Sequence, residues 1–338
     1  KAMIERGDIR GVTSNPTIFQ NAIAKTNDYD AALLPLAWAG WDAEKIFWQL
    51  AVEDIQQACD LFRPLYDETK GGDGYVSLEV SPYLANDTAG TTKQAKELWD
   101  RVNRPNLMVK IPATREGIPA IRQTIAAGIN VNVTLIFALD RYAAVMDAYV
   151  AGLEDRVAEN LPIQQIASVA SFFVSRVDTK IDPRLPADSH LLGKVAIANA
   201  KFAYDAFESI FTSPRFATLK ARFRARAQRP LWASTGTKNP KYPDTLYVDT
   251  LIGPDTVNTV PPATLAAFRD HGNAQMTITQ GLEEAQNHFA ELKALGISMS
   301  TVTKELEDEG VKSFADAFKT LLDAIEDRRK SALASIAL

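Results

Sequence analysis

Seven short β-forming runs alternate with longer helical patterns along this chain of 338 residues. The runs, rich in β-branched and aromatic residues, cover 9–13, 75–81, 107–112, 129–137, 166–173, 230–235 and 255–260. Helical periodicity marks 44–70, 91–102, 118–127, 139–153, 191–211, 246–252, 275–294 and 313–333. Alternation of this kind predicts an α/β protein built on a parallel sheet.

The number of strands leaves two architectures open. An open doubly wound sheet could use seven strands, whereas a closed (β/α)8 barrel needs one more. The chain begins with lysine, and a short helix-like segment precedes the first predicted strand. We therefore interpret the first barrel strand as lying upstream of residue 1. The prediction is a single (β/α)8 TIM-barrel domain over 1–338, with a C-terminal helical extension over about 273–338.

Three of the predicted strands have one polar face. Successive side chains of a strand point to opposite faces, so Ser77 and Glu79 oppose Val76 and Leu78. Lys110 takes the polar face of 107–112, and residues 130, 132 and 134 repeat the pattern in 129–137. Parallel strands covered by helices on both sides usually read as apolar runs. The polar faces therefore predict a barrel interior that holds a site, or else a structural polar core whose members satisfy each other's hydrogen bonds.

Lys110 is the residue that most needs an explanation. It stands in the apolar run 107–113, and burying an ammonium group is costly unless the proton is lost. The resulting neutral amine is a nucleophile that can form a Schiff base with a carbonyl compound. The alternative is a lysine near a strand end that extends to water. Glu79 precedes Lys110 by 31 residues, about one βαβ unit, which predicts that both point into one cavity from adjacent strands.

Other strand ends carry small, polar or cationic residues. Asn15 stands before Pro16, which can begin a helix, at the end of the first run. Ser171 stands near the end of a second strand, with Arg176 after it, and the segment 234–238 ends a third strand with hydroxyls, a glycine and a cation. Such groups after late barrel strands suit a phosphate site. The alternatives are ordinary turns and surface charges.

Composition excludes several other classes of function. The net charge of -5 makes nucleic acid an improbable partner, and we interpret the basic segment 212–229 as a solvated helix face. We find no apolar stretch long enough to cross a membrane and no signal-peptide core. With one cysteine and three widely spaced histidines, we expect no metal and no cofactor. A cytoplasmic location fits this pattern best.

Six motifs in order resemble the transaldolase family, from about residue 9 to about residue 262. They are GVTSNP (11–16), SLEV (77–80), MVKIPAT (108–114), NVTLIF (132–137), SFFVSR (171–176) and WAST (232–235). The resemblance is to the longer bacterial form, which is sometimes fused to a phosphoglucose isomerase. It implies a class I aldolase barrel of the non-oxidative pentose phosphate pathway. Such enzymes move a dihydroxyacetone unit from sedoheptulose 7-phosphate or fructose 6-phosphate to glyceraldehyde 3-phosphate or erythrose 4-phosphate.

The resemblance also implies roles for individual residues, with Lys110 as the Schiff-base lysine. Glu79 and Thr134 match the pair that handles a catalytic water. The remaining positions match substrate-binding residues (Asn15, Asn132, Ser171 and Phe173) and phosphate-binding residues (Arg176 and Ser234). Sugar phosphates are therefore the expected partners, and the chain is expected to act as a monomer or a homodimer.

Two positions depart from the family pattern. The family has an acid–base aspartate on its first barrel strand, and Asp8, just before the first predicted strand here, is a poor substitute. Many relatives have an arginine where this chain has Gly236, so Lys238 is expected to supply the cation. The alternatives left open are a fructose 6-phosphate aldolase and a catalytically impaired barrel within a fusion protein.

Overall fold

A computed structural model describes residues 1–334 of the chain. The chain divides into two compact units, which are described separately here. The first unit comprises Lys1–Ile111 together with the C-terminal segment that begins at Gly310. The second unit comprises Pro112–Glu309.

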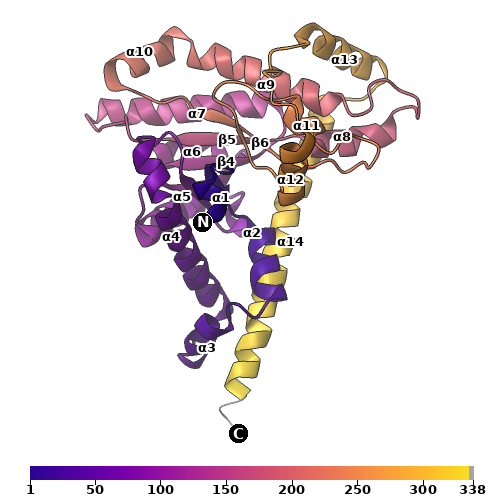
Figure 1. The fold of residues 1–338 in the computed structure, drawn as a ribbon. Coiled ribbons are helices and arrows are strands. Elements are labelled where there is room, and N and C mark those ends of the chain that lie inside the picture. The colour runs from indigo at the N-terminus through magenta and orange to yellow at the C-terminus, as the bar shows by residue number, and fades with distance from the viewer. Residues whose placement is uncertain (335–338) are drawn as a thin grey trace. The chain divides into compact units, whose positions relative to one another are not determined.

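The first unit contains three parallel strands. Strand β1 (Gly11–Thr13) pairs with β2 (Tyr75–Glu79), and β2 pairs with β3 (Leu107–Pro112). The crossovers between these strands contain α2 (Pro16–Phe19), a π-helical turn (Gln20–Ala24), α3 (Asp30–Trp38), α4 (Ala43–Glu68) and α5 (Thr88–Val102). A short helix, α1 (Ala2–Glu5), precedes β1. The helices of this unit up to α5 are labelled in Figure 1, in the indigo and purple part of the chain. Each strand lies beside the strand that precedes it in sequence, as in a (β/α)8 barrel.

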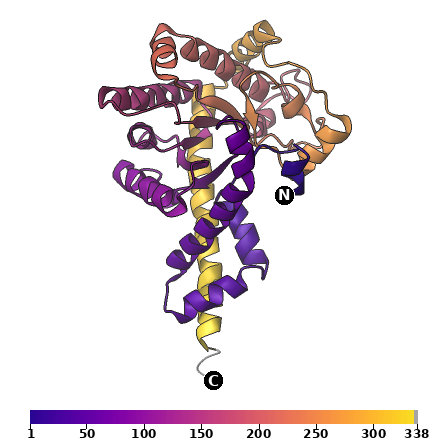
Figure 2. The ribbon, with the colours of Figure 1, turned by 60° about the vertical axis from the view of Figure 1, so that its left-hand side comes forward.

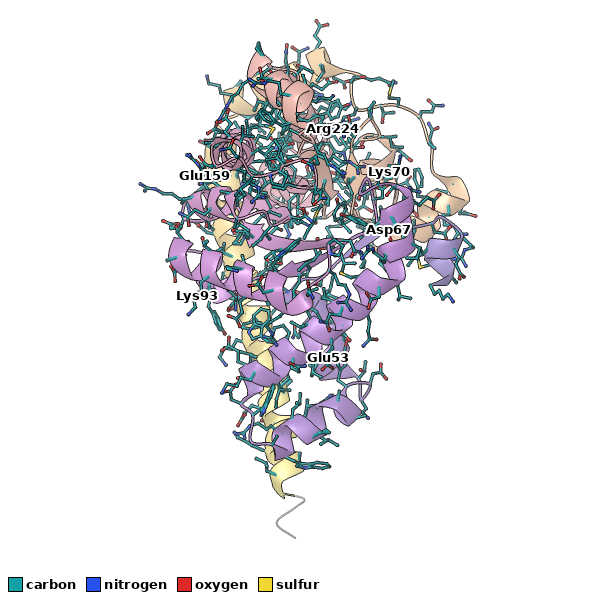
Figure 3. All side chains as sticks on the ribbon, turned by 90° about the vertical axis from the view of Figure 1, so that its left-hand side faces the viewer. Glu53, Asp67, Lys70, Lys93, Glu159 and Arg224 are labelled. Carbon is teal, nitrogen blue, oxygen red and sulfur yellow. The ribbon has the colours of Figure 1, made fainter. Side chains whose placement is uncertain are left out.

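Helix α4 shows how the sequence builds this unit. Asp42 caps its N-terminus by accepting a hydrogen bond from the Lys45 amide at 2.8 Å. The apolar stripe predicted from the sequence is buried, at Ile46, Leu50, Val52 and Ile55. Figure 3 labels three polar residues here: Glu53 within the helix, Asp67 near its C-terminal end and Lys70 just beyond it. Gly74 then turns the chain into β2 with φ +84°, and a Cβ there would lie 2.6 Å from the Tyr66 nitrogen.

Residues 310–334 of helix α14 (Met299–Ala334) pack against the early helices of the first unit (Figure 2). Phe318 contacts Phe47 edge to face, with ring centroids 5.2 Å apart. Arg328 donates to Asp30 at 2.9 Å, and the indole of Trp38 donates to a carbonyl near the end of the helix at 3.3 Å. Segments distant in the sequence therefore share one core in this unit.

The second unit contains four parallel strands in chain order, each paired with the next. They are β4 (Val131–Ile136), β5 (Ser168–Phe173), β6 (Arg229–Ala233) and β7 (Val257–Asn258). The helices are α6 (Gly117–Ala126), α7 (Leu139–Ala158), α8 (Ser175–Ile181), α9 (Val195–Phe211), α10 (Pro214–Phe223), α11 (Leu246–Asp249), α12 (Pro262–His271) and α13 (Leu282–Ala294). Figure 1 shows α9 between α7 and α13.

All seven predicted strands are present, and the α/β class with parallel strands is confirmed. The strand order within each unit is consistent with a TIM barrel, whereas the eighth strand and the single-domain assignment stay predictions. Several predicted boundaries are wrong. The predicted helix over 275–294 begins only at Leu282, because residues 277 and 278 donate to the Ile252 carbonyl and keep that segment in a loop. Helix α14 begins at Met299 rather than near residue 313, since Gly310, which usually weakens a helix, does not interrupt it.

Candidate active site

Lys110 and Glu79 form a buried ion pair in the first unit. The two residues are register partners on the adjacent strands β3 and β2. The Lys110 Nζ lies 3.2 Å from Glu79 Oε2, and the two residues are only 5% and 6% exposed. The predicted arrangement, a carboxylate and an amine on neighbouring strands, is therefore present. The alternative in which Lys110 extends to water is wrong.

Burial sets the electrostatics of this pair. It raises the pKa of the Glu79 carboxyl, and the Lys110 amine beside it only partly opposes that effect. Although the two groups are within ion-pair distance, Oε2 has no well-aligned hydrogen bond from any residue in the described part of the chain. The amine instead donates to the carbonyl oxygen of Ser14 at 3.3 Å. A carboxyl group that keeps its proton more readily can exchange it with the neighbouring amine.

The end of β1 adds Asn15 to the same unit. Asn15 is the N-cap of α2, which Pro16 begins as predicted, and its Oδ1 accepts a hydrogen bond from the Ile18 amide at 2.8 Å. This bond leaves the Nδ2 group available to donate to a hydroxyl or carbonyl oxygen. A shallow pocket in the first unit is lined by Asn15 and Glu79 among others.

Aromatic side chains of α14 border this pocket, and sequence reasoning missed them. Phe318 lines it together with Phe47 and Trp48. The ring of Phe314 lies 5.8 Å from the Lys110 Nζ, within the range of a cation–π contact. The helical pattern over 313–333 predicted an apolar stripe but not its target. Nothing in the sequence links that stripe to a strand some two hundred positions earlier.

In the second unit, Asn132 and Ser171 lie on the neighbouring strands β4 and β5. The Ser171 hydroxyl donates to Asn132 Oδ1 at 2.8 Å. Thr134, two residues beyond Asn132, is completely buried, and its Oγ1 has no hydrogen-bond partner among residues 1–334. A buried hydroxyl without a partner is an unusual feature, and a bound water or ligand would satisfy it.

The backbone of β4 is irregular immediately after Thr134. Leu135 has φ +59°, and the pairing of β4 with β5 shifts register between Val133 and Ile136. A leucine in the left-handed region is strained, and such bulges re-aim the neighbouring side chains. The sequence offers no sign of this irregularity, because a leucine there favours a regular strand.

Arg176, Ser175 and Ser234 come together beyond the ends of β5 and β6. The hydroxyls of Ser175 and Ser234 are hydrogen-bonded at 3.0 Å, and the Ser175 amide donates to the Ser234 carbonyl. The Arg176 guanidinium lies over the ring of Phe173, 5.3 Å from its centroid, and has no carboxylate within ion-pair distance in the described chain. Burial lowers the pKa of Arg176. Ser175 belongs to the predicted motif, but its hydrogen bond to Ser234 depends on the tertiary structure.

The structure shows the surroundings of the two positions that depart from the family pattern, Gly236 and Asp8. A Cβ at Gly236 would lie 3.3 Å from side-chain atoms of Pro261 and Thr264, so a larger residue there would displace them. Lys238, the expected substitute cation, is exposed. Asp8 forms an ion pair with Arg6 at 2.7 Å, which occupies its carboxylate near β1.

Metal-binding clusters and membrane-spanning helices are both absent from the described part of the chain. Among residues 1–334, no three His, Cys, Asp or Glu side chains come close enough together to hold a metal ion. None of the helices in that range combines the length and the apolar composition that a membrane span requires.

The similarity of this chain to known proteins extends along nearly its whole length. The family profile described as Transaldolase/Fructose-6-phosphate aldolase matches residues 1–325. Proteins named Transaldolase are similar to this chain: that of Parafrankia sp. (strain EAN1pec) is 53% identical over 328 residues, which is 95% of this chain and 89% of the relative. That of Thermobifida fusca (strain YX) is 50% identical, over 96% of this chain and 89% of the relative.

A third relative, the transaldolase of Mycolicibacterium smegmatis, is 49% identical over 98% of this chain and 90% of its own length. The matched region thus makes up about nine-tenths of each of these relatives, so they give no support to the alternative of a barrel within a fusion protein. The shared region includes both units and every residue predicted for the site. The chain belongs to the transaldolase/fructose-6-phosphate aldolase family.

Proposed function

We propose that this chain is a transaldolase that transfers a dihydroxyacetone unit between sugar phosphates through a Schiff base on Lys110. The donors are sedoheptulose 7-phosphate and fructose 6-phosphate, and the acceptors are glyceraldehyde 3-phosphate and erythrose 4-phosphate, which would place the enzyme in the non-oxidative pentose phosphate pathway. The observation that carries the proposal is the buried Lys110–Glu79 pair on adjacent strands. Membership of the family and the names of the relatives agree with it.

The covalent steps use the amine of Lys110 as nucleophile. After its proton has passed to Glu79, the amine adds to the ketose carbonyl and gives a carbinolamine, which loses water to form a protonated imine. The Glu79 carboxylate, which has given its proton to the departing water, takes the proton of the hydroxyl on the fourth carbon through the bound water. The bond between the third and fourth carbons breaks, its electron pair enters the imine to give an enamine, and the aldose leaves as an aldehyde. The same proton returns to the oxygen of the acceptor when the new carbon–carbon bond forms. The enamine attacks the acceptor aldehyde, and water hydrolyses the new imine and frees Lys110.

The other predicted residues have supporting roles in this proposal. Glu79 and Thr134 handle the water that carries protons in carbinolamine formation and breakdown, which would satisfy the unpartnered Thr134 hydroxyl. The four positions that match the family's substrate-binding residues (Asn15, Asn132, Ser171 and Phe173) bind the hydroxyls of the three-carbon unit. The phosphate is bound by Arg176 and Ser234, with Lys238 as an outer cation.

Trapping the imine tests the assignment of Lys110. Borohydride reduction of the protein with fructose 6-phosphate should attach a three-carbon adduct to Lys110, detected by peptide mass spectrometry. Lys201 is the control, because burial lowers its pKa but it lies outside the site, and it should remain unmodified. An active protein whose Lys110 stays unmodified under these conditions would falsify the assignment.

Replacing Arg176 tests the phosphate site. Arg176→Ala should raise KM for fructose 6-phosphate by about 10–100-fold, since a hydrogen bond to a charged group is worth about 1.5–3 kcal/mol. The KM for unphosphorylated dihydroxyacetone should hardly change. Arg176→Lys, which keeps the charge but lacks the planar fork, should give an intermediate value. Equal effects on both donors would remove Arg176 from the phosphate site.

The family description also covers fructose-6-phosphate aldolase, which is the second candidate. The two activities differ in the fate of the enamine: a transferase passes it to an acceptor, whereas an aldolase releases free dihydroxyacetone. Product analysis with fructose 6-phosphate, with and without an aldose phosphate acceptor, separates them. Release of dihydroxyacetone at the same rate in both reactions would favour the aldolase.

A further inference from the structure

Two carboxylates of the second unit, one buried and one half-buried, lie in and just after the helix that begins at the proposed phosphate site. Asp178 belongs to α8, the helix that carries Arg176, and Asp182 follows one turn later. Asp178 is 1% exposed and forms no ion pair with the described residues. The proposed reaction uses neither residue, so the question is what a buried carboxylate does at this position.

Each carboxylate accepts a backbone hydrogen bond from the segment 193–196, which contains the start of α9. The Ala196 amide donates to Asp178 Oδ1 at 2.7 Å, and the Gly193 amide donates to Asp182 Oδ1 at 3.2 Å. These bonds tie α8 to the start of α9.

Each carboxylate also accepts a tyrosine hydroxyl through its other oxygen. Tyr247 donates to Asp178 Oδ2 at 2.8 Å, and Tyr242 donates to Asp182 Oδ2 at 2.6 Å. Gly193 makes room for the second contact, because a Cβ there would lie 2.9 Å from the Tyr242 ring. Both tyrosines lie in the segment 236–249, which continues from Ser234 and contains Lys238.

The two Asp–Tyr pairs therefore join the two segments that supply the proposed phosphate ligands. One segment is α8, with Ser175 and Arg176 at its start. The other leads from Ser234, at the end of β6, to α11. At the site itself, bonds between Ser175 and Ser234 join the two segments. The Asp–Tyr pairs repeat that connection further along the same two segments.

We propose that the Asp178–Tyr247 and Asp182–Tyr242 pairs are positioning residues that hold Arg176 and Ser234 at the separation a sugar phosphate requires. The inference rests on the proposed function, since it assumes that Arg176 and Ser234 bind the phosphate. Loss of either tyrosine hydroxyl lets the 236–249 segment move away from α8. The phosphate group can then contact Arg176 or Ser234 but not both at once. The sugar phosphate therefore binds more weakly, while the chemistry at Lys110 continues.

The test replaces each tyrosine by phenylalanine, which removes only the hydroxyl. Tyr247→Phe should raise KM for fructose 6-phosphate about tenfold, the change that corresponds to 1.4 kcal/mol, and Tyr242→Phe should act in the same direction. Inhibition by inorganic phosphate should weaken by a similar factor. The kcat, and the KM for unphosphorylated dihydroxyacetone, should change little.

Tyr149→Phe is the matched control. Its hydroxyl is also buried and donates to a backbone carbonyl, that of Arg226, at 2.8 Å, but it does not join α8 to the 236–249 segment. It should leave the KM for the sugar phosphate unchanged. Thermal unfolding checks that each variant is folded. If Tyr247→Phe does not fold, the KM of Tyr242→Phe tests the positioning role, because the ring of Tyr242 is only half-buried.

The outcomes separate this inference from the function on which it rests. If Arg176→Ala raises KM selectively for the phosphorylated donor while both phenylalanine variants behave like the parent, the positioning role is wrong and the phosphate site stands. If the phenylalanine variants reduce kcat equally with both donors, the pairs have a general structural role and the inference is also wrong. If Arg176→Ala is not selective, the phosphate site and the positioning role fail together.

Discussion

The Lys110 amine and the Glu79 carboxyl face each other with little access to water. A charged pair and a neutral pair hold the same number of protons, but only the charged pair must be stripped of its hydration. Burial raises the pKa of Glu79, which favours the neutral form of the pair. A Schiff-base enzyme needs that form, because only an unprotonated amine can attack a carbonyl. The ring of Phe314 beside the amine helps to exclude water.

The pH dependence of protein stability tests the effect of burial on the Asp178 carboxyl group. Burial raises its pKa from 3.8 to about 7, against the bonds from Ala196 and Tyr247. Because the folded state holds the proton more tightly than the unfolded state, the contribution of this group to stability is present below about pH 4 and lost by about pH 7. Asp178→Asn removes the titration and keeps an acceptor for the Ala196 amide.

The free energy of unfolding of the parent should therefore fall relative to Asp178→Asn as the pH rises from about 4 to about 7, by about 2–4 kcal/mol. Urea denaturation at several pH values measures this difference. Asp205→Asn, on the exposed side of α9, is the control, and it should shift the stability by less than about 0.5 kcal/mol at any pH. A constant difference between parent and Asp178→Asn would show that Asp178 ionises in the folded protein as it does in the unfolded chain.

At the scale of elements, long amphipathic helices were predictable and short ones were not. Helix α4 has a 3.6-residue apolar period over many turns, so its bounds were predicted to within two residues. Helices α2 and α8 have four and seven residues, too few for a period to appear, although Asn15 caps α2 and α8 carries Arg176. Their positions depend on caps and on contacts made after the strands have formed.

The packing of α14 in the first unit can be tested at this scale. Phe318 is 1% exposed and contacts Phe47, Trp48 and Tyr83 with ring centroids 5.2, 6.1 and 5.4 Å apart. Phe318→Ala should lower the free energy of unfolding by about 3–5 kcal/mol, because it removes a large buried ring. Denaturant unfolding measures the loss.

Lys319→Ala is the matched control on the same turn of α14. Its side chain is exposed and pairs only with Asp323, so the change should be within about 0.5 kcal/mol. Similar losses for the two variants would mean that residues 310–334 do not share a core with the early helices.

At the scale of the molecule, strand–helix alternation was sufficient to predict parallel strands in sequence order. The chain confirms this within each unit, over β1–β3 and over β4–β7. Side-chain alternation then placed Glu79 and Lys110 side by side, since a parallel register brings equivalent faces of neighbouring strands together. Family membership agrees with the motifs on these strands.

The sequence by itself determined the fold class, the strand order within each unit and the lysine–carboxylate pair, because those features follow from local periodicity and from the pleat of a strand. Only the tertiary structure decided which distant side chains complete the surroundings. Phe314 lies beside Lys110, and Tyr247 bonds to Asp178 across 69 positions of chain. The strained Leu135 also belongs to this second group. No local pattern encodes such contacts, because they depend on how whole helices and loops pack, and packing is a property of the assembled chain rather than of any one segment.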